Sequence, residues 1–243
     1  MPETSIVASI NTDREFTLAG PATLEGTSLH TGQKVTLTIK PAPGGHGFKF
    51  RRVDLPDKPF IDADVGRVEQ VERATTLASG SVRVHTVEHV LSALTGMGVD
   101  NALIEMDANE PPIGDGSARP FVDLVRKAGL EEQESRRKTW EIREPIHFDD
   151  KNGSHITIVP YRGFRVSVTN LSHLGKFTQY FSSEVTPELY ESEIAPARTF
   201  TFYEDIKPLL DQGLIKGGSL ENAVVIRDEE ILSKEPMRFD NEF

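Results

Sequence analysis

Apolar and polar residues alternate along short stretches of the chain, most clearly over residues 34–40. The sequence K-V-T-L-T-I-K puts Val35, Leu37 and Ile39 on one face and polar side chains on the other. This period of two predicts a half-buried antiparallel strand. A turn rich in proline and glycine follows, and a second short strand is expected to begin at Gly47. Further strands are predicted at residues 75–77 and 82–84, as a hairpin, and at residues 101–106 and 222–226.

Four segments between these strands are predicted to be helical. Gly96, Gly129 and Gly213 end three of them, because glycine is the usual residue just after a helix. Strand pairs interleaved with helices favour an α+β fold with two domains, each a mainly antiparallel sheet with helices on one face. The four segments are residues 86–94, 120–128, 187–194 and 203–210.

A charged run without apolar residues, E-E-Q-E-S-R-R-K at residues 131–138, is interpreted as a linker. After it, residues 157–160 and 163–166 repeat the pattern of residues 38–41 and 47–50: a strand that ends at proline, a turn through glycine, and a restart on phenylalanine. We interpret this echo as an internal duplication, although two ordinary hairpins would give the same pattern. The predicted domains are residues 1–130 and 139–243.

The composition narrows the functions that this fold can have. None of the 243 residues is cysteine, so neither a disulfide nor a thiolate is available, which is compatible with a reducing cytosol. The net charge of −11 disfavours nucleic acid as the main partner. No stretch approaches the roughly 18 uninterrupted apolar residues of a membrane span, and the N-terminal residues lack the pattern of a secretory signal. We therefore expect a cytoplasmic protein that acts on a small molecule.

The clearest candidate chemistry is the pentapeptide H-T-V-E-H at residues 85–89. If this stretch is helical, His85 and His89 share a face and both can reach one metal ion. Glu88 lies about 100° round the helix from His89, where it is badly placed as a ligand but can reach a metal-bound water. The pattern also fits the inverted zincin signature H-x-x-E-H. An amphipathic core helix explains the same pentapeptide, and none of the other five histidines has an obvious ligand spacing.

Four other groups of residues are weaker candidates. His30 lies in a glycine-bounded turn, where a hydrogen-bonded turn histidine is the simpler interpretation. Asp115 and Ser117 form a turn before a predicted helix, and one or the other is expected to cap it by accepting backbone N–H bonds. Arg198 is interpreted as part of a surface connector. Lys216 stands before two glycines, whose backbone N–H groups together with this cation could receive a phosphate.

No single motif decides the function, but the order of the motifs does. In order, they are L-E-G-T-S-L-H-T-G (24–32), K-V-T-L-T-I-K-P-A-P (34–43), T-V-E-H (86–89), D-N-A-L-I-E (100–105), P-I-G-D-G-S-A-R-P-F (112–121), A-R-T-F (197–200), G-L-I-K-G-G-S-L-E-N-A (213–223) and R-F-D-N-E-F (238–243). This ordered set resembles the bacterial UDP-3-O-acyl-N-acetylglucosamine deacetylases, from about residue 16 to residue 243.

The resemblance implies a zinc-dependent hydrolase that removes the N-acetyl group from UDP-3-O-(3-hydroxyacyl)-N-acetylglucosamine, the committed step of lipid A biosynthesis. It also implies two similar α+β domains with the helices sandwiched between two sheets. By the same resemblance, His89 is a zinc ligand and Glu88 is the general base on the zinc-bound water. Thr199 stabilises the oxyanion, and Phe200 helps to shape the sugar site. Lys216, in another shared motif, is expected to bind substrate.

The resemblance changes two expectations. It makes His85 a neighbour of the metal rather than a ligand. In the family, a helix carrying H-x-x-x-D follows R-F-x-x-E-F and completes the zinc site with an adjacent lysine, and a further histidine serves as general acid. The sequence ends at Phe243, so we expect a truncated and inactive portion of the enzyme.

Two alternatives stay open. An inverted-zincin peptidase would use His85, His89 and a distant glutamate, whereas the deacetylase requires Glu88 and His89 and tolerates the loss of His85. A non-catalytic module that binds a UDP-sugar or an acyl chain would have lost its metal site. Zinc content and acetate release distinguish the three.

Overall fold

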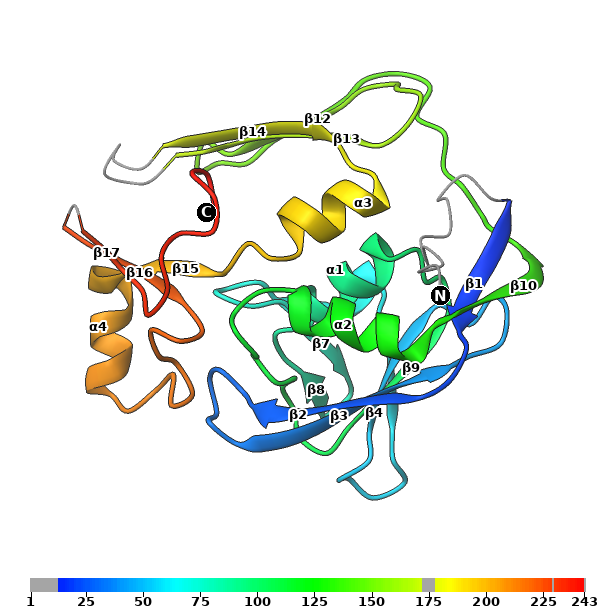
Figure 1. Cartoon of the computed structure of the whole chain (residues 1–243), viewed down its shortest axis with the longest axis horizontal. Helices are drawn as coiled ribbons and strands as arrows, with labels where there is room; N and C mark the ends of the chain where they lie inside the picture. Colours follow the sequence, from blue (N-terminus) through cyan, green and yellow to red (C-terminus); the bar gives the residue numbers. More distant parts are fainter. Residues whose placement is uncertain (1–12, 172–177, 229, 243) are drawn as a thin grey trace, which may run out of the picture.

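The computed structural model describes residues 13–171, 178–228 and 230–242 and has a mixed α+β architecture (Figure 1). Its N-terminal half is built on a five-stranded sheet, in which β9 runs antiparallel to β3 and parallel to β4. The predicted alternation is present in β3, where Val35, Leu37 and Ile39 are buried. In sheet order the strands are β2 (Ala22–Thr27), β3 (Lys34–Pro41), β9 (Ala102–Met106), β4 (Phe48–Arg52) and β5 (Phe60–Asp62).

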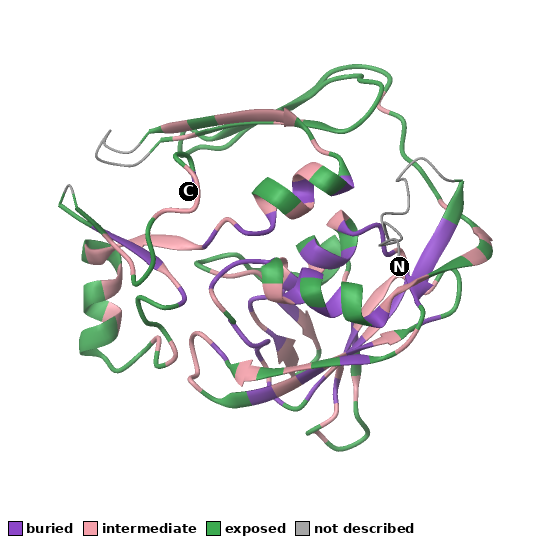
Figure 2. Cartoon of the chain, viewed as in Figure 1, coloured by how far each residue is buried: buried purple, intermediate pink, exposed green. Residues whose placement is uncertain are grey.

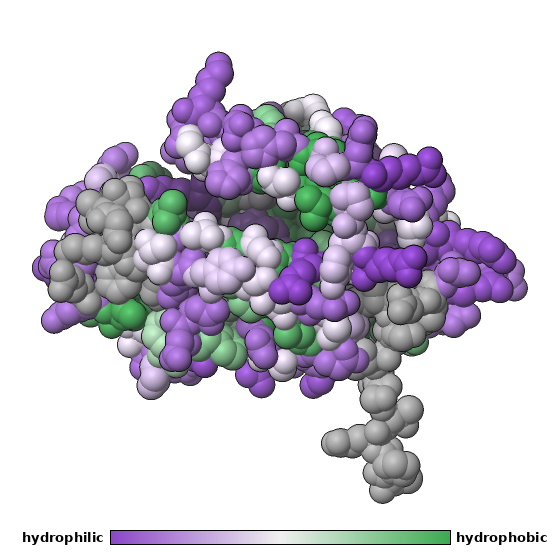
Figure 3. Space-filling model, turned by 90° about the horizontal axis from the view of Figure 1, so that it is seen from above, coloured by the Kyte–Doolittle hydropathy of each residue, from purple (hydrophilic) through white to green (hydrophobic). Residues whose placement is uncertain are grey.

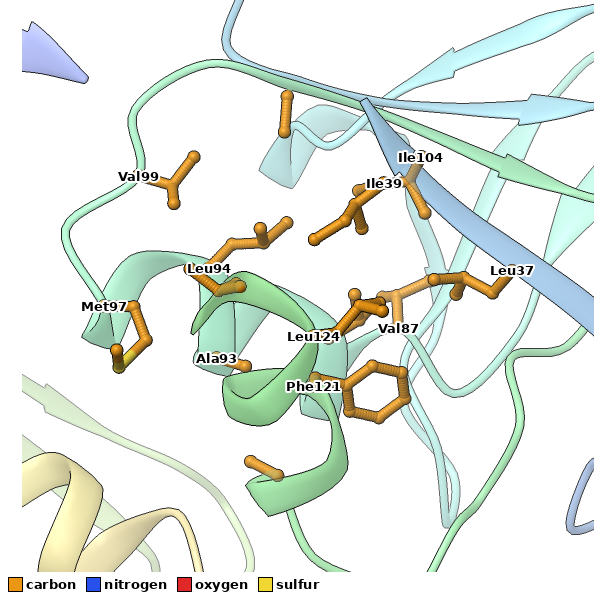
Figure 4. Packing of buried hydrophobic residues seen from close by; sticks show 14 of the residues in the cluster. Leu37, Ile39, Val87, Ala93, Leu94, Met97, Val99, Ile104, Phe121 and Leu124 are labelled. Carbon is orange, nitrogen blue, oxygen red and sulfur yellow. The ribbon is translucent and has the colours of Figure 1, made fainter. Parts of the chain in front are cut away.

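Helices α1 (Glu88–Gly96) and α2 (Arg119–Ala128) lie against one face of this sheet and enclose the main hydrophobic core (Figures 1 and 4). As predicted, α2 ends at Gly129, whose φ of 71° is in the left-handed region that favours glycine. Each fully buried large apolar side chain contributes about 1.5–3 kcal/mol. The core residues include Leu37, Ile39, Val87, Leu94, Ile104, Phe121 and Leu124.

A small three-stranded sheet directly precedes α1 in the chain. The predicted hairpin is confirmed: β7 and β8 pair antiparallel, with Ser79 opposite Val82 across a tight turn. β6 pairs with the other side of β7. Because β8 ends one residue before His85, this sheet positions the pentapeptide. The bounds are β6 (Val68–Gln70), β7 (Thr76–Ser79) and β8 (Val82–Val84), and a 3-10 turn (Val65–Arg67) precedes β6.

The predicted linker at residues 131–138 is wrong, because strand β10 (Leu130–Arg136) spans most of it. β10 pairs antiparallel with β1 (Arg14–Leu18). Strand pairing depends on backbone hydrogen bonds, and polar side chains are accepted on the inner face when they find partners. Ser135 of β10 meets this condition, because its hydroxyl donates to Glu15 at 2.7 Å. The division into two domains stays a prediction.

The C-terminal half forms a second β layer and a small mixed sheet. Two hairpins make the layer, most of which is exposed (Figure 2). Seen from above, the surface is mainly hydrophilic with apolar residues among the polar ones (Figure 3). Exposed large apolar side chains of this part of the chain include Phe148, Ile156 and Phe164. The segment predicted to be helical at 187–194 is helical, as α3 continued by a π-helix, η2. The bounds are β11 (Ile146–Asp149), β12 (His155–Ile158), β13 (Arg165–Asn170), β14 (Gln179–Glu184), α3 (Pro187–Leu189), η2 (Tyr190–Ile194), β15 (Phe200–Phe202), α4 (Tyr203–Asp211), β16 (Val224–Arg227) and β17 (Glu230–Leu232).

The helices α1, α2 and α3 lie between the five-stranded sheet and the layer of β11–β14 (Figure 1). The α+β fold with helices sandwiched between sheets is therefore confirmed. The internal duplication stays a prediction, because the strands of the two supposed copies are paired differently. In the first copy, β3 and β4 both pair with β9. In the second copy, β12 and β13 belong to separate hairpins. In the described ranges, no helix has both the length and the apolar character that crossing a membrane requires.

Tyr190 of η2 joins the C-terminal half to α1. Its side chain is buried, and its hydroxyl lies 2.8 Å from the hydroxyl of Ser92. Burial raises the pKa of Tyr190 to about 12, so the neutral phenol is the form present at physiological pH. Its ring lies so close to Gly96 that a Cβ there would come within 2.4 Å of the ring carbons. The contact between the two halves therefore needs the absence of a side chain at this position.

We expect Gly96→Ala to lower the free energy of unfolding by about 1–3 kcal/mol, because the added methyl group forces the Tyr190 ring outward. Alanine has the higher helix propensity, so propensity alone predicts the opposite sign. Thr95→Ala, one residue earlier on the exposed face of α1, is the matched control and should change stability by less than about 0.5 kcal/mol. Urea unfolding of both variants measures the difference; a stabilised Gly96→Ala protein would contradict the packing described.

Candidate active site

The structure separates the two histidines of the pentapeptide, because α1 begins only at Glu88. His85 belongs to the turn before the helix, where its Nδ1 lies 2.9 Å from the hydroxyl of Thr76. Thr86 has a φ of 55°, which interrupts helical geometry between His85 and His89. The expectation that both imidazoles share a helical face is therefore wrong, and the physical cause is the left-handed residue between them.

Glu88 and His89 open α1 and are partly buried. An Oε2 atom of Glu88 accepts the backbone N–H of Thr75 at 3.0 Å. Burial lowers the pKa of His89, against the opposing effect of the Glu88 and Asp115 carboxylates and of a hydrogen bond to the backbone of Ser117. The neutral imidazole is the form that binds a metal, and a ligand histidine usually bonds a backbone carbonyl through its second nitrogen. His89 therefore fits the role of a single metal ligand.

The rest of a metal site is not present among residues 13–171, 178–228 and 230–242. Within these ranges, no group of three histidine, aspartate or glutamate side chains is close enough to hold a metal ion. A catalytic zinc takes three protein ligands and keeps one open position. The described residues thus fit one ligand of the zinc ion that the sequence resemblance implies, and they do not complete its coordination.

Thr199 and Phe200 line a cavity of about 420 Å³ between α4 and the sheet of β15, β16 and β17. His30 and Arg73, from the N-terminal half, lie on the wall of the same cavity. The structure therefore brings together residues from segments that are far apart in the sequence. Most of the wall is apolar, and includes Ile206, Leu210, Ile215, Val225 and Leu232.

The backbone of Thr199 is held from two sides. Its N–H donates to the carbonyl oxygen of Gly116 at 2.7 Å, and its own carbonyl accepts the N–H of Val224 at 3.0 Å. Gly116 has a φ of 84°, and a Cβ there would lie 2.0 Å from the carbonyl oxygen of Asn222. Only glycine fits this crossing of two chain segments. The turn that contains Gly116 is therefore a support for Thr199 as well as the start of a helix.

The turn before α2 contains side-chain hydrogen bonds to backbone N–H groups, but the N-cap residue of α2 is Ala118, which makes no side-chain capping bond. Asp115 accepts the backbone N–H of Ser117 at 3.1 Å and its hydroxyl at 2.7 Å, and the Ser117 hydroxyl in turn accepts the N–H of Arg119. The prediction that Asp115 and Ser117 accept backbone N–H bonds is confirmed, whereas the prediction that one of them is the N-cap of α2 is wrong.

Lys216 does not stand beside free glycine N–H groups. Its own N–H donates to the carbonyl of His30 at 3.2 Å, and the N–H of Gly217 donates to the carbonyl of Leu29 at 3.0 Å. Gly218 is also engaged, with the carbonyl of Ile215. The expected phosphate-binding backbone is therefore wrong, because these donors fasten the segment to the turn that carries His30. A role for the exposed side chain of Lys216 in substrate binding stays a prediction.

Glu110 is the candidate that the sequence did not single out. Its side chain is fully buried, and its Oε1 lies 2.7 Å from Nδ1 of His30. The prediction of a hydrogen-bonded turn histidine at position 30 is thereby confirmed. The two residues are 80 positions apart, so no spacing could pair them. The only local signal was an acidic residue directly before two prolines.

Comparison with known proteins agrees with the motif order. A sequence model described as UDP-3-O-acyl N-acetylglycosamine deacetylase matches residues 15–243. The chain belongs to this deacetylase family. A protein of Myxococcus xanthus named UDP-3-O-acyl-N-acetylglucosamine deacetylase is 42% identical over 93% of this chain and 72% of its own length. Proteins of the same name are 41% identical in Legionella pneumophila, over 90% of this chain and 72% of theirs, and 41% identical in Pseudomonas entomophila, over 95% and 77%.

Two ion pairs connect three of the motifs that carry the deacetylase resemblance. Arg198, interpreted from sequence as a surface connector, is buried, with Nε 2.6 Å from Oε1 of Glu242. Burial opposes ionisation of Glu242, but hydrogen bonds from the Arg198 side chain and from backbone N–H groups hold its pKa below the ordinary value. Arg238 lies 2.9 Å from Asp115. Together these pairs hold Arg198, which precedes Thr199, and the turn of Asp115 against the segment of residues 238–242.

We expect Glu242→Gln to lower the free energy of unfolding at pH 7 by about 3–5 kcal/mol, because Arg198 is left buried without a counter-charge. Since the folded pKa of Glu242 is depressed, its contribution is present above the unfolded pKa and is lost as pH falls through the folded value. Glu235→Gln, which removes an exposed partner of Arg238, is the control and should cost less than about 1 kcal/mol. Equal losses in urea unfolding would show that the buried pair has no special role.

Proposed function

We propose that this protein is a zinc-dependent deacetylase that hydrolyses the N-acetyl group of UDP-3-O-(3-hydroxyacyl)-N-acetylglucosamine, in the committed step of lipid A biosynthesis. The observation that carries the proposal is the match over residues 15–243, together with relatives that all bear this deacetylase name. A cytoplasmic location belongs to the proposal and is supported by the cysteine-free composition.

Amide hydrolysis needs a base for the attacking water and a donor for the oxygen that becomes negative. Glu88 is proposed to accept the proton of the water. Its position at the start of α1, with one oxygen held by the Thr75 N–H, supports this role. Thr199 is proposed to donate its hydroxyl to the carbonyl oxygen of the acetyl group, which contributes about 3 kcal/mol when the donor is well placed. The two backbone hydrogen bonds of Thr199 keep that donor at the cavity wall.

His89 is the ligand that we propose for the zinc ion from among the described residues. When bound, zinc lowers the pKa of a water molecule and polarises a carbonyl group. The lowered pKa of the partly buried His89 supports this role, because the lowering favours the neutral imidazole. Other ligands are needed for tight binding, since the described ranges hold no group of three.

The cavity next to Thr199 suits the acylated substrate. Its wall is mostly apolar, and Phe200 belongs to it, so an acyl chain can exchange water for apolar contacts there. His30 and Arg73 add polar and cationic groups to the wall. The ammonium group of Lys216 is proposed to serve the charged part of the UDP-sugar, because the segment that carries it is bonded to the turn of His30.

One alternative loses support and another keeps it. A peptidase of the inverted-zincin type needs His85 and His89 on one helical face, and His85 lies before the helix with its ring bonded to Thr76. A non-catalytic module that binds the UDP-sugar or its acyl chain agrees with the apolar cavity and with the incomplete metal ligands of the described ranges. Turnover separates this second candidate from the deacetylase.

The proposed roles are tested in a chimera that joins residues 1–243 to the residues of the Myxococcus xanthus relative that follow its match to this chain. We expect it to bind about one zinc ion and to release acetate from the acylated UDP-sugar. Glu88→Ala should lower kcat by about 10²–10⁴-fold with zinc retained, because the base is lost. His89→Ala should remove both zinc and activity, whereas His85→Ala, the matched control, should keep both. Full turnover by Glu88→Ala or His89→Ala would refute the assignment.

The 243-residue chain by itself is proposed to be inactive. One imidazole holds zinc weakly, so we expect metal analysis after dialysis to find well below one zinc ion per chain. Acetate release should stay at the level of the buffer. Stoichiometric zinc with turnover by this chain would overturn the proposal that the described residues supply one zinc ligand and leave the site incomplete.

A further inference from the structure

Glu110 carries a buried charge that the proposed reaction does not use. Its side chain is fully buried, which opposes ionisation, yet hydrogen bonds from His30 and Thr86 hold its pKa below the ordinary value. Its oxygens accept the backbone N–H groups of His30 at 3.1 Å and Thr31 at 3.2 Å. They also accept the hydroxyl of Thr86 at 2.9 Å. An ionised carboxylate out of water is stable only with such a set of donors.

Thr86 reaches Glu110 from a strained backbone. Its φ of 55° lies in the left-handed region, which is rare and unfavourable for a β-branched residue. The strain lies two residues before Glu88, at the entry to α1. The hydroxyl of Thr86 bonds to Oε1, the same oxygen that meets the His30 ring. The turn that starts α1 and the turn that carries His30 are thus fastened to one carboxylate.

His30 contacts Glu110 through one ring nitrogen and also lines the cavity. Its Nδ1 faces Oε1 of Glu110 at 2.7 Å, and Glu110 carries the negative charge, so Nδ1 holds the proton. About a third of the side chain is exposed, and the residue lines the cavity together with Thr199 and Arg73. Nε2 is therefore the ring atom available to a ligand in that cavity.

We propose that Glu110 is a positioning residue which, braced by the Thr86 hydroxyl, holds His30 in its Nδ1–H form and directs Nε2 into the cavity, where the neutral ring accepts a hydrogen bond from a hydroxyl group of the substrate. This use of Nε2 in turnover rests on the proposed deacetylase function, whereas the Nδ1–H form does not. Other groups act on the same ring. The hydrogen bond to Glu110 raises the pKa of His30 most, burial lowers it, Glu88 raises it further and Arg73 lowers it, and His85 lies near enough to feel its charge. A protonated His30 carries a second N–H, on Nε2, for an oxygen acceptor.

The proton position can be read directly by two-bond ¹H–¹⁵N correlation spectra of the ¹⁵N-labelled 243-residue chain. His30→Gln assigns the resonance by removing one of the seven histidine patterns. At a pH above its titration, we expect wild-type His30 to show the Nδ1–H tautomer, whereas an unrestrained side chain favours Nε2–H. Glu110→Gln should mix the tautomers and lower the midpoint of the His30 titration, because an amide carries no charge and can also donate.

Thr86 gives a matched pair of variants. Thr86→Ser keeps the hydroxyl and should keep the wild-type His30 pattern, whereas Thr86→Ala removes the donor and should move the pattern toward that of Glu110→Gln. Asp62→Asn, which removes a surface partner of Lys49, is the charge control and should leave His30 unchanged. If Glu110→Gln does not fold, the proposal is tested by the His30 tautomer of the wild-type chain and by the His30 patterns of Thr86→Ser and Thr86→Ala.

An Nε2–H tautomer in the wild-type chain, or a His30 pattern identical in wild type and a folded Glu110→Gln protein, would overturn the proposal. The spectra do not involve turnover. Failure of acetate release in the chimera therefore leaves the Nδ1–H result standing, and a wrong tautomer leaves the deacetylase assignment standing.

Discussion

A carboxylate removed from water must have donors for both oxygens, and two glutamates meet this requirement by joining distant segments of the chain. Glu110 collects donors from residues 30, 31 and 86, and Glu242 collects them from residues 198 and 238. The cost of burying an unpartnered charge is several kcal/mol, which is a large part of the stability of a domain. Each glutamate therefore permits few arrangements of its partners, and those partners flank the residues of the candidate site.

The site depends on both halves of the molecule. The N-terminal half supplies Glu88 and His89 at the start of α1, where packing of the helix on the sheet fixes their direction. The C-terminal half supplies Thr199 and the apolar cavity. The two are joined by direct contacts, from Tyr190 to Ser92 and from Thr199 to Gly116. A change at these contacts would move the proposed catalytic groups of one half relative to those of the other.

Enclosure of apolar surface differs between the halves. The five-stranded sheet and its two helices bury a continuous core, while the hairpins of β11–β14 leave Phe148, Ile156 and Phe164 about two-thirds exposed (Figure 2). Free energy from burial scales with the apolar area removed from water. The stability of this chain therefore comes mainly from its N-terminal half, and the C-terminal layer depends more on strand pairing and on the buried Arg198–Glu242 pair.

The sequence by itself determined several of the elements and the family. Local sequence patterns were sufficient to predict the strand around Leu37, the hairpin before His85 and helix α2 with its terminal glycine. Each of these elements depends on residues that are neighbours in the chain. The order of short motifs was sufficient for the family. The charged strand β10 was read as a linker, since its polar face is satisfied by partners far away, such as Glu15.

Only the tertiary structure decided how the site is assembled. It placed His85 outside the helix through the left-handed Thr86, and it buried Arg198 on Glu242. It also used the glycine backbone after Lys216 to fasten the turn of His30. In each case the deciding partner is distant in sequence or the backbone takes a conformation that no local pattern encodes. The fold brings a buried charge next to its counter-charge, and the spacing of the two residues in the sequence does not indicate that they are in contact.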